Sequence, residues 1–366
     1  MRPTRRSLEL ATGSALRSAA AVVAGITGRL PGSSARAGLP PEPEFPLPDA
    51  PGRVIAATAH WSVPERFDFF ARAIAAVQDQ VPSFGFAAFV NGPRSTAVVA
   101  ADLRASGHFP DDVAIDVVAE RDAAAYLMRA GSRIACIPWH GRGNPYRLTW
   151  RHHRLYRDLV LRHDVFRDVT HLVYFEDDMA LAPDALAYWC AYRPLLAPHG
   201  LLPGFLRVEG PLDDLRMHGW RRRSDGRPRV AVPEADAADP RTVWFVNLSG
   251  PYQAMYVLDR DLAEWHVRHS PFRSRGRSKV APVHGARWGV PERAATGPIF
   301  DRAVPDGFLS RNCLPLVRTD GDRAMPLPAS LVRHLPDKDL QDLDAPQGKT
   351  RLVDAFILDP DPTPTV

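Results

Sequence analysis

The sequence predicts an α/β protein with a mainly parallel, twisted sheet flanked by helices in a single domain. Two observations support this fold class. From residue 53 onward, short apolar runs alternate with segments in which apolar residues recur at helical spacing. One of these runs ends directly in three acids, Glu176, Asp177 and Asp178. Alternating strands and helices favour a parallel sheet covered on both faces. Ligands of such sheets bind beyond the carboxyl ends of the strands.

Composition limits the classes of function. The chain has 366 residues, 45% hydrophobic and 24% charged, which is enough for one large domain or two ordinary ones. Its net charge is +4, and it has no long basic run interleaved with aromatic residues, so no nucleic-acid partner is expected. The scattered arginines suit small anionic substrates. The three cysteines form no CxxC pair, which argues against a disulfide framework or a zinc site.

The first 52 residues are predicted to be a leader and a proline-rich linker without packed structure. Residues 4–8 resemble a twin-arginine export signal. Against export, Arg17 interrupts an apolar stretch that is too short to span a bilayer. We therefore expect a cytoplasmic protein, compatible with peripheral membrane association, and keep export as the alternative. Residues 53–335 are predicted to form the folded domain, and residues 336–366 a tail.

Three strand–helix units open the predicted domain. Strands are expected at residues 54–59, 84–90 and 113–118, and helices from Pro64, over residues 96–105 and over residues 121–129. The ends of the first two strands carry Thr58, His60 and Asn91. Because the carboxyl ends of parallel strands meet at one edge of a sheet, these side chains are candidates for ligand binding.

The most informative stretch is the strand predicted at residues 170–175, which the three acids follow. Each buried carboxylate would lose its hydration, so adjacent acids at the end of a buried strand are a poor way to build a core. They are a good way to hold a divalent cation. Mg²⁺ and Mn²⁺ prefer hard oxygen ligands, and Mg²⁺ usually needs only one or two protein carboxylates besides substrate phosphates. The alternative is a solvated acidic loop.

A basic segment precedes the acidic strand. A helix is predicted to start near Leu148 or Thr149, and its opening turns carry Arg147 and Arg151. Cations at a helix N-terminus oppose the helix dipole, so local propensity does not explain them. A bound diphosphate would, because it accepts from helix N–H groups and from arginine. The alternative is a solvated basic face.

Together these features resemble the glycosyltransferases of the GT-A fold, the nucleotide-diphospho-sugar transferase superfamily. Residues 173–178, VYFEDD, are similar to the DxD-type motif of that family, with Glu176 in place of the first Asp. The helix that carries residues 148–151 is similar to the helix that precedes this motif. The resemblance extends over residues 53–335.

The resemblance implies a GT-A-like fold and an activity. A sugar would pass from a nucleotide-diphosphate sugar donor to a saccharide or another hydroxyl acceptor, with Mn²⁺ or Mg²⁺ as cofactor and inversion at the anomeric carbon. Asp178 would be the most direct metal ligand, and Glu176 and His334 would complete the metal site. His334 has the alternative of an ordinary surface histidine. The residues implied in donor binding are Thr58, His60, Asn91, Arg147, Arg151 and Asp177.

The candidate catalytic base is Glu292. It follows Pro291 at a predicted helix start. Inverting members of the family place a carboxylate near such a start, where it removes the proton of the acceptor hydroxyl, a general-base role. The alternative is that Glu292 only complements the helix dipole.

Two other functions stay open from the sequence: a nucleotidyltransferase, and a non-catalytic carbohydrate-binding relative. A nucleotidyltransferase is expected to carry a glycine-rich, basic loop after its first strand. Residues 59–66 occupy that place and contain no glycine, which disfavours this function. A sequence alone does not distinguish an enzyme from a non-catalytic relative.

Overall fold

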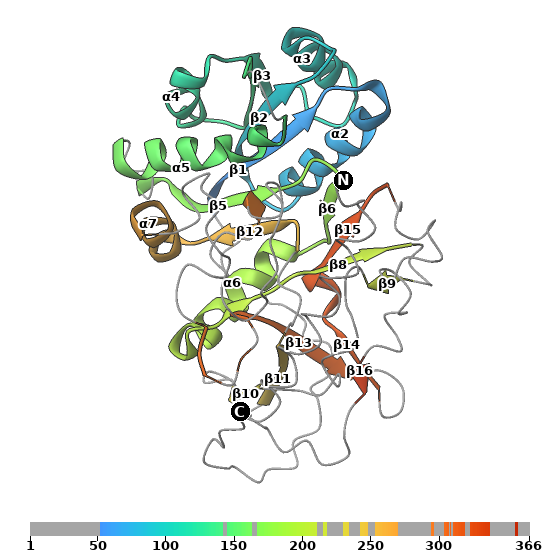
Figure 1. Cartoon of the computed structure of the whole chain (residues 1–366), viewed down its shortest axis with the longest axis vertical. Helices are drawn as coiled ribbons and strands as arrows, with labels where there is room; N and C mark the ends of the chain where they lie inside the picture. Colours follow the sequence, from blue (N-terminus) through green and yellow to red (C-terminus); the bar gives the residue numbers. More distant parts are fainter. Residues whose placement is uncertain are drawn as a thin grey trace, which may run out of the picture.

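The computed structural model describes residues 52–141, 145–162, 167–210, 215–217, 230–233, 242–247, 253–269, 294–295, 304–306, 308, 310–318, 323–336 and 356–357. Its upper half in Figure 1 is a six-stranded sheet with helices on both sides. A second six-stranded sheet and a four-stranded sheet lie below it.

The six-stranded sheet has the strand order β12-β5-β1-β2-β4-β3. Five neighbouring strands are parallel: β1 (Arg53–Trp61), β2 (Ser83–Asn91), β3 (Ala114–Val117), β4 (Arg133–Pro138) and β5 (Val169–Phe175). The edge strand β12 (Met255–Leu258) pairs antiparallel with β5. The central strands are near-continuous apolar runs because both faces of the sheet are covered. The expected mixed α/β fold with a mainly parallel, helix-flanked sheet is confirmed.

Helices cover both faces of this sheet. On one side lie α2 (Pro64–Gln78) and α3 (Thr96–Ala105), and on the other lie α4 (Ala123–Leu127), α5 (Arg151–Arg162) and α7 (Arg260–His269). Helix α2 buries Phe70, Ile74 and Val77 at the spacing of one helical face. Helix α3 begins after Ser95, whose hydroxyl accepts from the backbone N–H of Val98.

The order of the strands reverses between β1 and β5. From β1 the chain passes through α2 to β2 on one side, and it later returns through α5 to β5 on the other side of β1. A sheet of this kind has a topological switch point between two such strands, and ligands bind beyond the carboxyl ends there. His60 lies at that end of β1, and the three acids follow β5.

The second sheet, with the order β6-β15-β8-β9, continues directly from the acidic run. Its strands are β6 (Met179–Leu181), β8 (Leu206–Glu209), β9 (Arg216–Met217) and β15 (Leu331–His334). Strand β15 pairs antiparallel with β6 and parallel with β8. This sheet therefore brings the end of β15 beside the residues that follow β5.

The third sheet lies lower in Figure 1 and has the order β10-β11-β13-β14-β16, with β7 also paired to β13. Its strands are β7 (Leu202–Pro203), β10 (Val230–Pro233), β11 (Thr242–Asn247), β13 (Asn312–Arg318), β14 (Arg323–Pro326) and β16 (Phe356–Ile357). Helix α6 (Ala185–Leu196) packs on β7, and the Tyr188 hydroxyl donates to the carbonyl of Gly204 at 2.8 Å.

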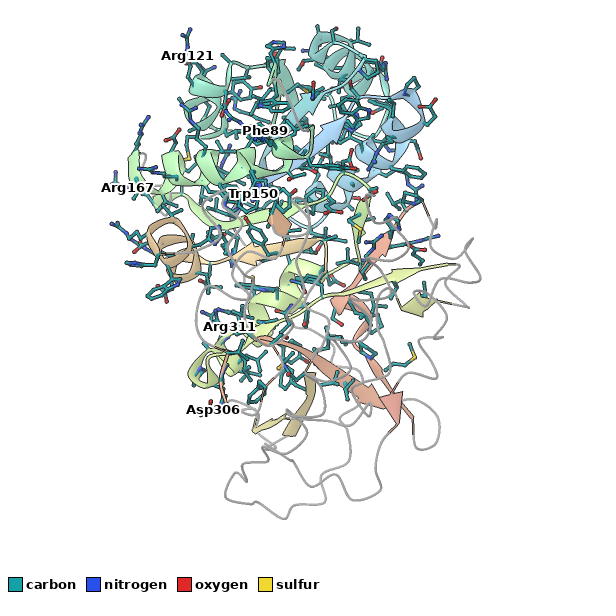
Figure 2. All side chains as sticks on the ribbon, in the orientation of Figure 1. Phe89, Arg121, Trp150, Arg167, Asp306 and Arg311 are labelled. Carbon is teal, nitrogen blue, oxygen red and sulfur yellow. The ribbon has the colours of Figure 1, made fainter. Side chains whose placement is uncertain are left out.

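One cluster of buried hydrophobic residues connects the three sheets. It runs from Val54 and Phe175 in the first sheet to Val332 in the second and Phe245 in the third. Figure 2 shows Phe89 and Trp150 within the upper half, whereas Arg121 points away from it. Among the described residues, no helix is both long and apolar enough to cross a bilayer.

Several elements differ from those predicted. Residues 121–129 are split between a 3-10 turn, η1 (Glu120–Asp122), and the short helix α4. A 3-10 turn, η2 (Pro145–Trp150), precedes α5. Further 3-10 turns are η4 (Ala197–His199) and η7 (Pro328–Ser330). Strand β4 and helix α6 (Ala185–Leu196) were not predicted.

Candidate functional site

The three acids form a tight turn that joins the first sheet to the second. The N–H of Met179 donates to the carbonyl of Glu176 at 3.1 Å, so Asp177 and Asp178 take the two central positions of a β-turn. The N–H of Glu176 donates to Ala254, just before β12, at 3.0 Å, and the N–H of Leu335 donates to the carbonyl of Asp178 at 2.9 Å. Backbone hydrogen bonds from both sheets therefore fix this acidic turn (residues 176–178).

Asp177 faces β1 and the first turn of α2. Its Oδ2 accepts from Nδ1 of His60 at 2.7 Å, and its Oδ1 accepts from Nη2 of Arg66 at 2.6 Å. The His60 ring stacks on Phe70, with 4.0 Å between the ring centroids. Because a carboxylate only accepts, His60 carries its proton on Nδ1, and the buried Nε2 has no hydrogen-bond partner among the described residues.

Asp178 faces Arg66 and the end of β15. Its Oδ2 accepts from Nη2 of Arg66 at 3.0 Å and lies 3.4 Å from Nε2 of His334. Burial raises the pKa of the Asp178 carboxyl, but the hydrogen bond from His334 and the charges of His334, Arg66 and Arg207 outweigh this and lower it to about 2. Asp178 is therefore an anion, and its buried Oδ1 lacks a hydrogen-bond partner in the described part of the chain.

His334 contacts two carboxylates: Asp178 lies near its Nε2, and Glu209 lies at its Nδ1. The register of β8 and β15 pairs Val332 with Arg207 and Arg333 with Val208, so His334 and Glu209 follow as the next neighbours. Glu209 Oε1 accepts from Nδ1 of His334 and lies 3.7 Å from Nη2 of Arg207. Burial lowers the pKa of His334, but its bonds to Asp178 and Glu209 outweigh burial and raise it.

These contacts pair three buried carboxylates with positively charged side chains. Asp177, Asp178 and Glu209 are 5%, 4% and 1% exposed, and an isolated buried carboxylate is very unfavourable. Arg66 and Arg207 supply two positive charges, and His334 carries a third while it is protonated. Breaking such a network by removing one partner is strongly destabilising because it leaves a buried charge uncompensated.

The structure brings four of the predicted site residues together: His60, Asp177, Asp178 and His334. Glu176 belongs to the same turn and is half-buried. Thr58 is fully buried below the turn, where its hydroxyl donates to the carbonyl of Phe175 at 2.7 Å. Thr58 therefore supports the end of β5 from within.

The other predicted donor-binding residues lie apart from the acidic turn. Asn91 ends β2, the neighbour of β1, and its carbonyl accepts from the N–H of Ser62 at 2.7 Å. Arg147 is exposed in η2 and forms no ion pair with the described residues. Arg151 forms an ion pair with Glu120, which follows β3. Part of the positive charge at the start of α5 is thus balanced within the protein.

Three charged residues of the site were not predicted from the sequence. Arg66 lies in the first turn of α2, where a cation opposes the helix dipole, and this position was the available signal. Arg207 and Glu209 alternate with apolar residues in β8, a pattern that is typical of a solvent-facing side. In the structure both side chains are buried, and Glu209 contacts His334 at the end of the paired strand β15. No local signal distinguishes the two cases.

The site is chemically suited to a divalent cation with few protein ligands. No three His, Cys, Asp or Glu side chains of the described chain converge into a set that would hold a metal alone. Asp178 and His334 offer one carboxylate with a buried Oδ1 and one imidazole whose other nitrogen faces Glu209. A carboxylate behind a histidine is the usual support of a metal ligand. Mg²⁺ commonly takes its remaining ligands from water and phosphate. The predicted base, Glu292, lies outside the described residues.

No protein-family model and no curated protein sequence matches this chain.

Proposed function

We propose that this protein is a metal-dependent glycosyltransferase of the GT-A type, which transfers a sugar from a nucleotide-diphosphate donor to a hydroxyl acceptor. The observation that carries the proposal is the pair of Asp178 and His334 beyond the carboxyl end of a parallel strand, with Glu209 behind the histidine. These two residues are among the metal ligands that the family resemblance implies. They also lie where ligands are expected to bind in such a sheet, beyond the carboxyl ends of its strands.

Asp178 and His334 would hold Mn²⁺ or Mg²⁺, which supplies positive charge against the charge that develops on the leaving nucleoside diphosphate. Glu209 accepts from Nδ1 of His334, so Nε2 is the nitrogen that faces Asp178 and that would bind the cation in place of its proton. The ligand set is small because the substrate's own phosphates complete it.

The donor side of the site contains Arg66 and His60, both held by Asp177. A guanidinium forms strong, charge-assisted hydrogen bonds with phosphate oxygens. The Arg66 side chain is 37% exposed, so it is accessible to a bound anion. Arg147 is a second exposed cation at the same edge of the sheet and keeps its predicted role in donor binding.

The acceptor side is proposed from the sequence alone. An acceptor hydroxyl is a weak nucleophile, and its proton has to leave as the new bond forms. Glu292 is the proposed base, and a single displacement with one base inverts the anomeric carbon.

A donor panel tests the proposal. The protein is incubated with UDP-, GDP- and dTDP-sugars and Mn²⁺, and release of the nucleoside diphosphate is measured with and without EDTA. We expect release from at least one donor, and its loss in EDTA. Binding of a sugar nucleotide without any release would instead indicate a non-catalytic carbohydrate-binding protein. Release of pyrophosphate from a nucleoside triphosphate and a sugar phosphate would indicate a nucleotidyltransferase.

A further inference from the structure

Arg66 binds both carboxylates at the centre of the acidic turn. A single nitrogen, Nη2, lies 2.6 Å from Oδ1 of Asp177 and 3.0 Å from Oδ2 of Asp178. An arginine guanidinium is a permanent cation in proteins. One charged group thus compensates two buried acids.

Arg66 and a divalent cation would compete for the same carboxylate. Oδ2 of Asp178 already accepts from Arg66, and it faces His334 Nε2 across 3.4 Å. Oδ1 of the same carboxylate is buried and lacks a hydrogen-bond partner among the described residues, so the anion is only half satisfied by protein groups. A cation at Asp178 and the guanidinium would repel each other at this short range.

We propose that Arg66 is an internal counter-ion of the acidic turn, which a divalent cation has to displace from Asp178 and which a substrate diphosphate then draws away. The inference rests on the proposed function, since it concerns the same metal site. Arg66 is suited to this exchange because one side of its side chain is open to solvent, whereas Arg207 and His334 are buried. The helix backbone around Arg66 need not move, because the long side chain alone can turn.

This role makes cation binding depend on the diphosphate. Without an anion, the cation binds weakly because it displaces the guanidinium. With an anion, the guanidinium has another partner, and the cation binds more tightly. Such coupling is reciprocal, so the cation strengthens diphosphate binding by the same factor. Arg66 would thus neutralise the two acids in the free protein and contact the diphosphate in the complex.

The test is a Mn²⁺ titration followed by electron paramagnetic resonance on the full chain, without nucleotide. We compare the wild type with Arg66→Met, which keeps an unbranched apolar stem and removes the charge, and Arg66→Lys, which keeps the charge. The control is Arg72→Met on the same helix, because Arg72 is paired with Asp68 on the surface. Circular dichroism and Tm confirm that each variant is folded. The titrations are then repeated with UDP and with GDP.

The expected result is that Arg66→Met binds Mn²⁺ about tenfold more tightly than the wild type without nucleotide, the scale of one partly screened charged hydrogen bond. Arg66→Lys and Arg72→Met should stay close to the wild type. A diphosphate should tighten Mn²⁺ binding more in the wild type than in Arg66→Met. A purely structural role for Arg66 would not produce a gain in metal affinity.

Other outcomes separate the inference from the proposed function. Equal Mn²⁺ affinity in the wild type and Arg66→Met, or weaker affinity in Arg66→Met, would overturn the counter-ion role and leave the metal site in place. Failure of every folded variant to bind Mn²⁺, with either diphosphate present, would overturn the metal-dependent function itself. If Arg66→Met does not fold, Arg66→Gln, which also removes the charge, replaces it: tighter Mn²⁺ binding than in the wild type without nucleotide supports the role, and equal or weaker binding refutes it.

Discussion

Replacing Glu209 by glutamine should destabilise the protein and weaken the metal site at the same time. Glu209 is 1% exposed and accepts from His334, with Arg207 Nη2 at 3.7 Å. Breaking a buried ion pair costs about 3–5 kcal/mol. Glutamine keeps an oxygen that accepts from His334 Nδ1, so we expect about 2–3 kcal/mol for the loss of charge alone.

Urea unfolding followed by circular dichroism measures the free energy of unfolding of this variant. The matched control is Glu264→Gln on α7, because Glu264 forms a surface pair with Arg260 at 3.3 Å and should cost below about 0.5 kcal/mol. We also expect Mn²⁺ affinity to fall by about 10–100-fold in Glu209→Gln, as is typical when the group behind a metal-binding histidine is changed. A destabilisation no larger than that of the control, with unchanged Mn²⁺ affinity, would refute the role assigned to Glu209.

Three further predictions concern acid stability, the metal and the base. Burial, opposed by the charge of Asp259, lowers the pKa of His171 to about 4 from 6.5. The folded state therefore resists protonation, and the stability that neutral His171 contributes above pH 6.5 is lost as the pH falls towards 4. Urea unfolding measured between pH 7 and pH 4 should show that this group lowers the free energy of unfolding by about 1–3 kcal/mol over that range, and the loss should be smaller in His171→Gln. The same dependence on pH in the wild type and in His171→Gln would contradict the assignment. Asp178→Asn should abolish transfer and Mn²⁺-dependent nucleotide affinity while circular dichroism stays unchanged; full activity of this variant, or of the wild type in EDTA, would remove the metal from the account. Glu292→Gln should lower kcat by about 10²–10⁴ with little change in donor affinity, and NMR should show an inverted product; a retained configuration or a near-normal kcat would exclude both the base and the inverting route.

The central sheet was predictable because its signals are local. The strands at β1, β2 and β5 are short apolar runs that are bounded by turn or charged residues, and α2 has a clear helical period. The need for a cation beside the three acids was also predictable, since adjacent carboxylates after a buried strand require compensation, but the sequence predicted a metal ion in that role. Cations of the protein lie there in the structure, in the form of Arg66 and the nearby His334.

The second and third sheets were not predicted as sheets because they join short strands that are distant in sequence. Strand β15 pairs with β6 and β8, which precede it by more than 120 residues. The pairing places Glu209 beside His334, and no property of residues 206–209 alone distinguishes their buried polar side from a solvent-facing one. Glu209 could therefore not be identified as a site residue without the register of the two strands.

The start of α5 gives a contrasting case. The sequence predicted a bound anion near Arg151 because cations at a helix start need compensation. The structure supplies an anion from the protein, Glu120, which lies in η1, before α4. The same physical argument applies to Arg66 in α2, where the compensating anions are Asp177 and Asp178. A charge at an unfavourable helix position thus indicates that a partner exists, but does not identify it.

The central claim is that Asp178 and His334 are ligands of one divalent cation. The most direct measurement is a crystal structure with Mn²⁺ and a nucleoside diphosphate, in which anomalous scattering locates the manganese. The account predicts an anomalous peak in direct bonding contact with a carboxylate oxygen of Asp178 and with Nε2 of His334, and Arg66 turned away from Asp178. A manganese peak elsewhere, or none while Arg66 stays on both carboxylates, would contradict it.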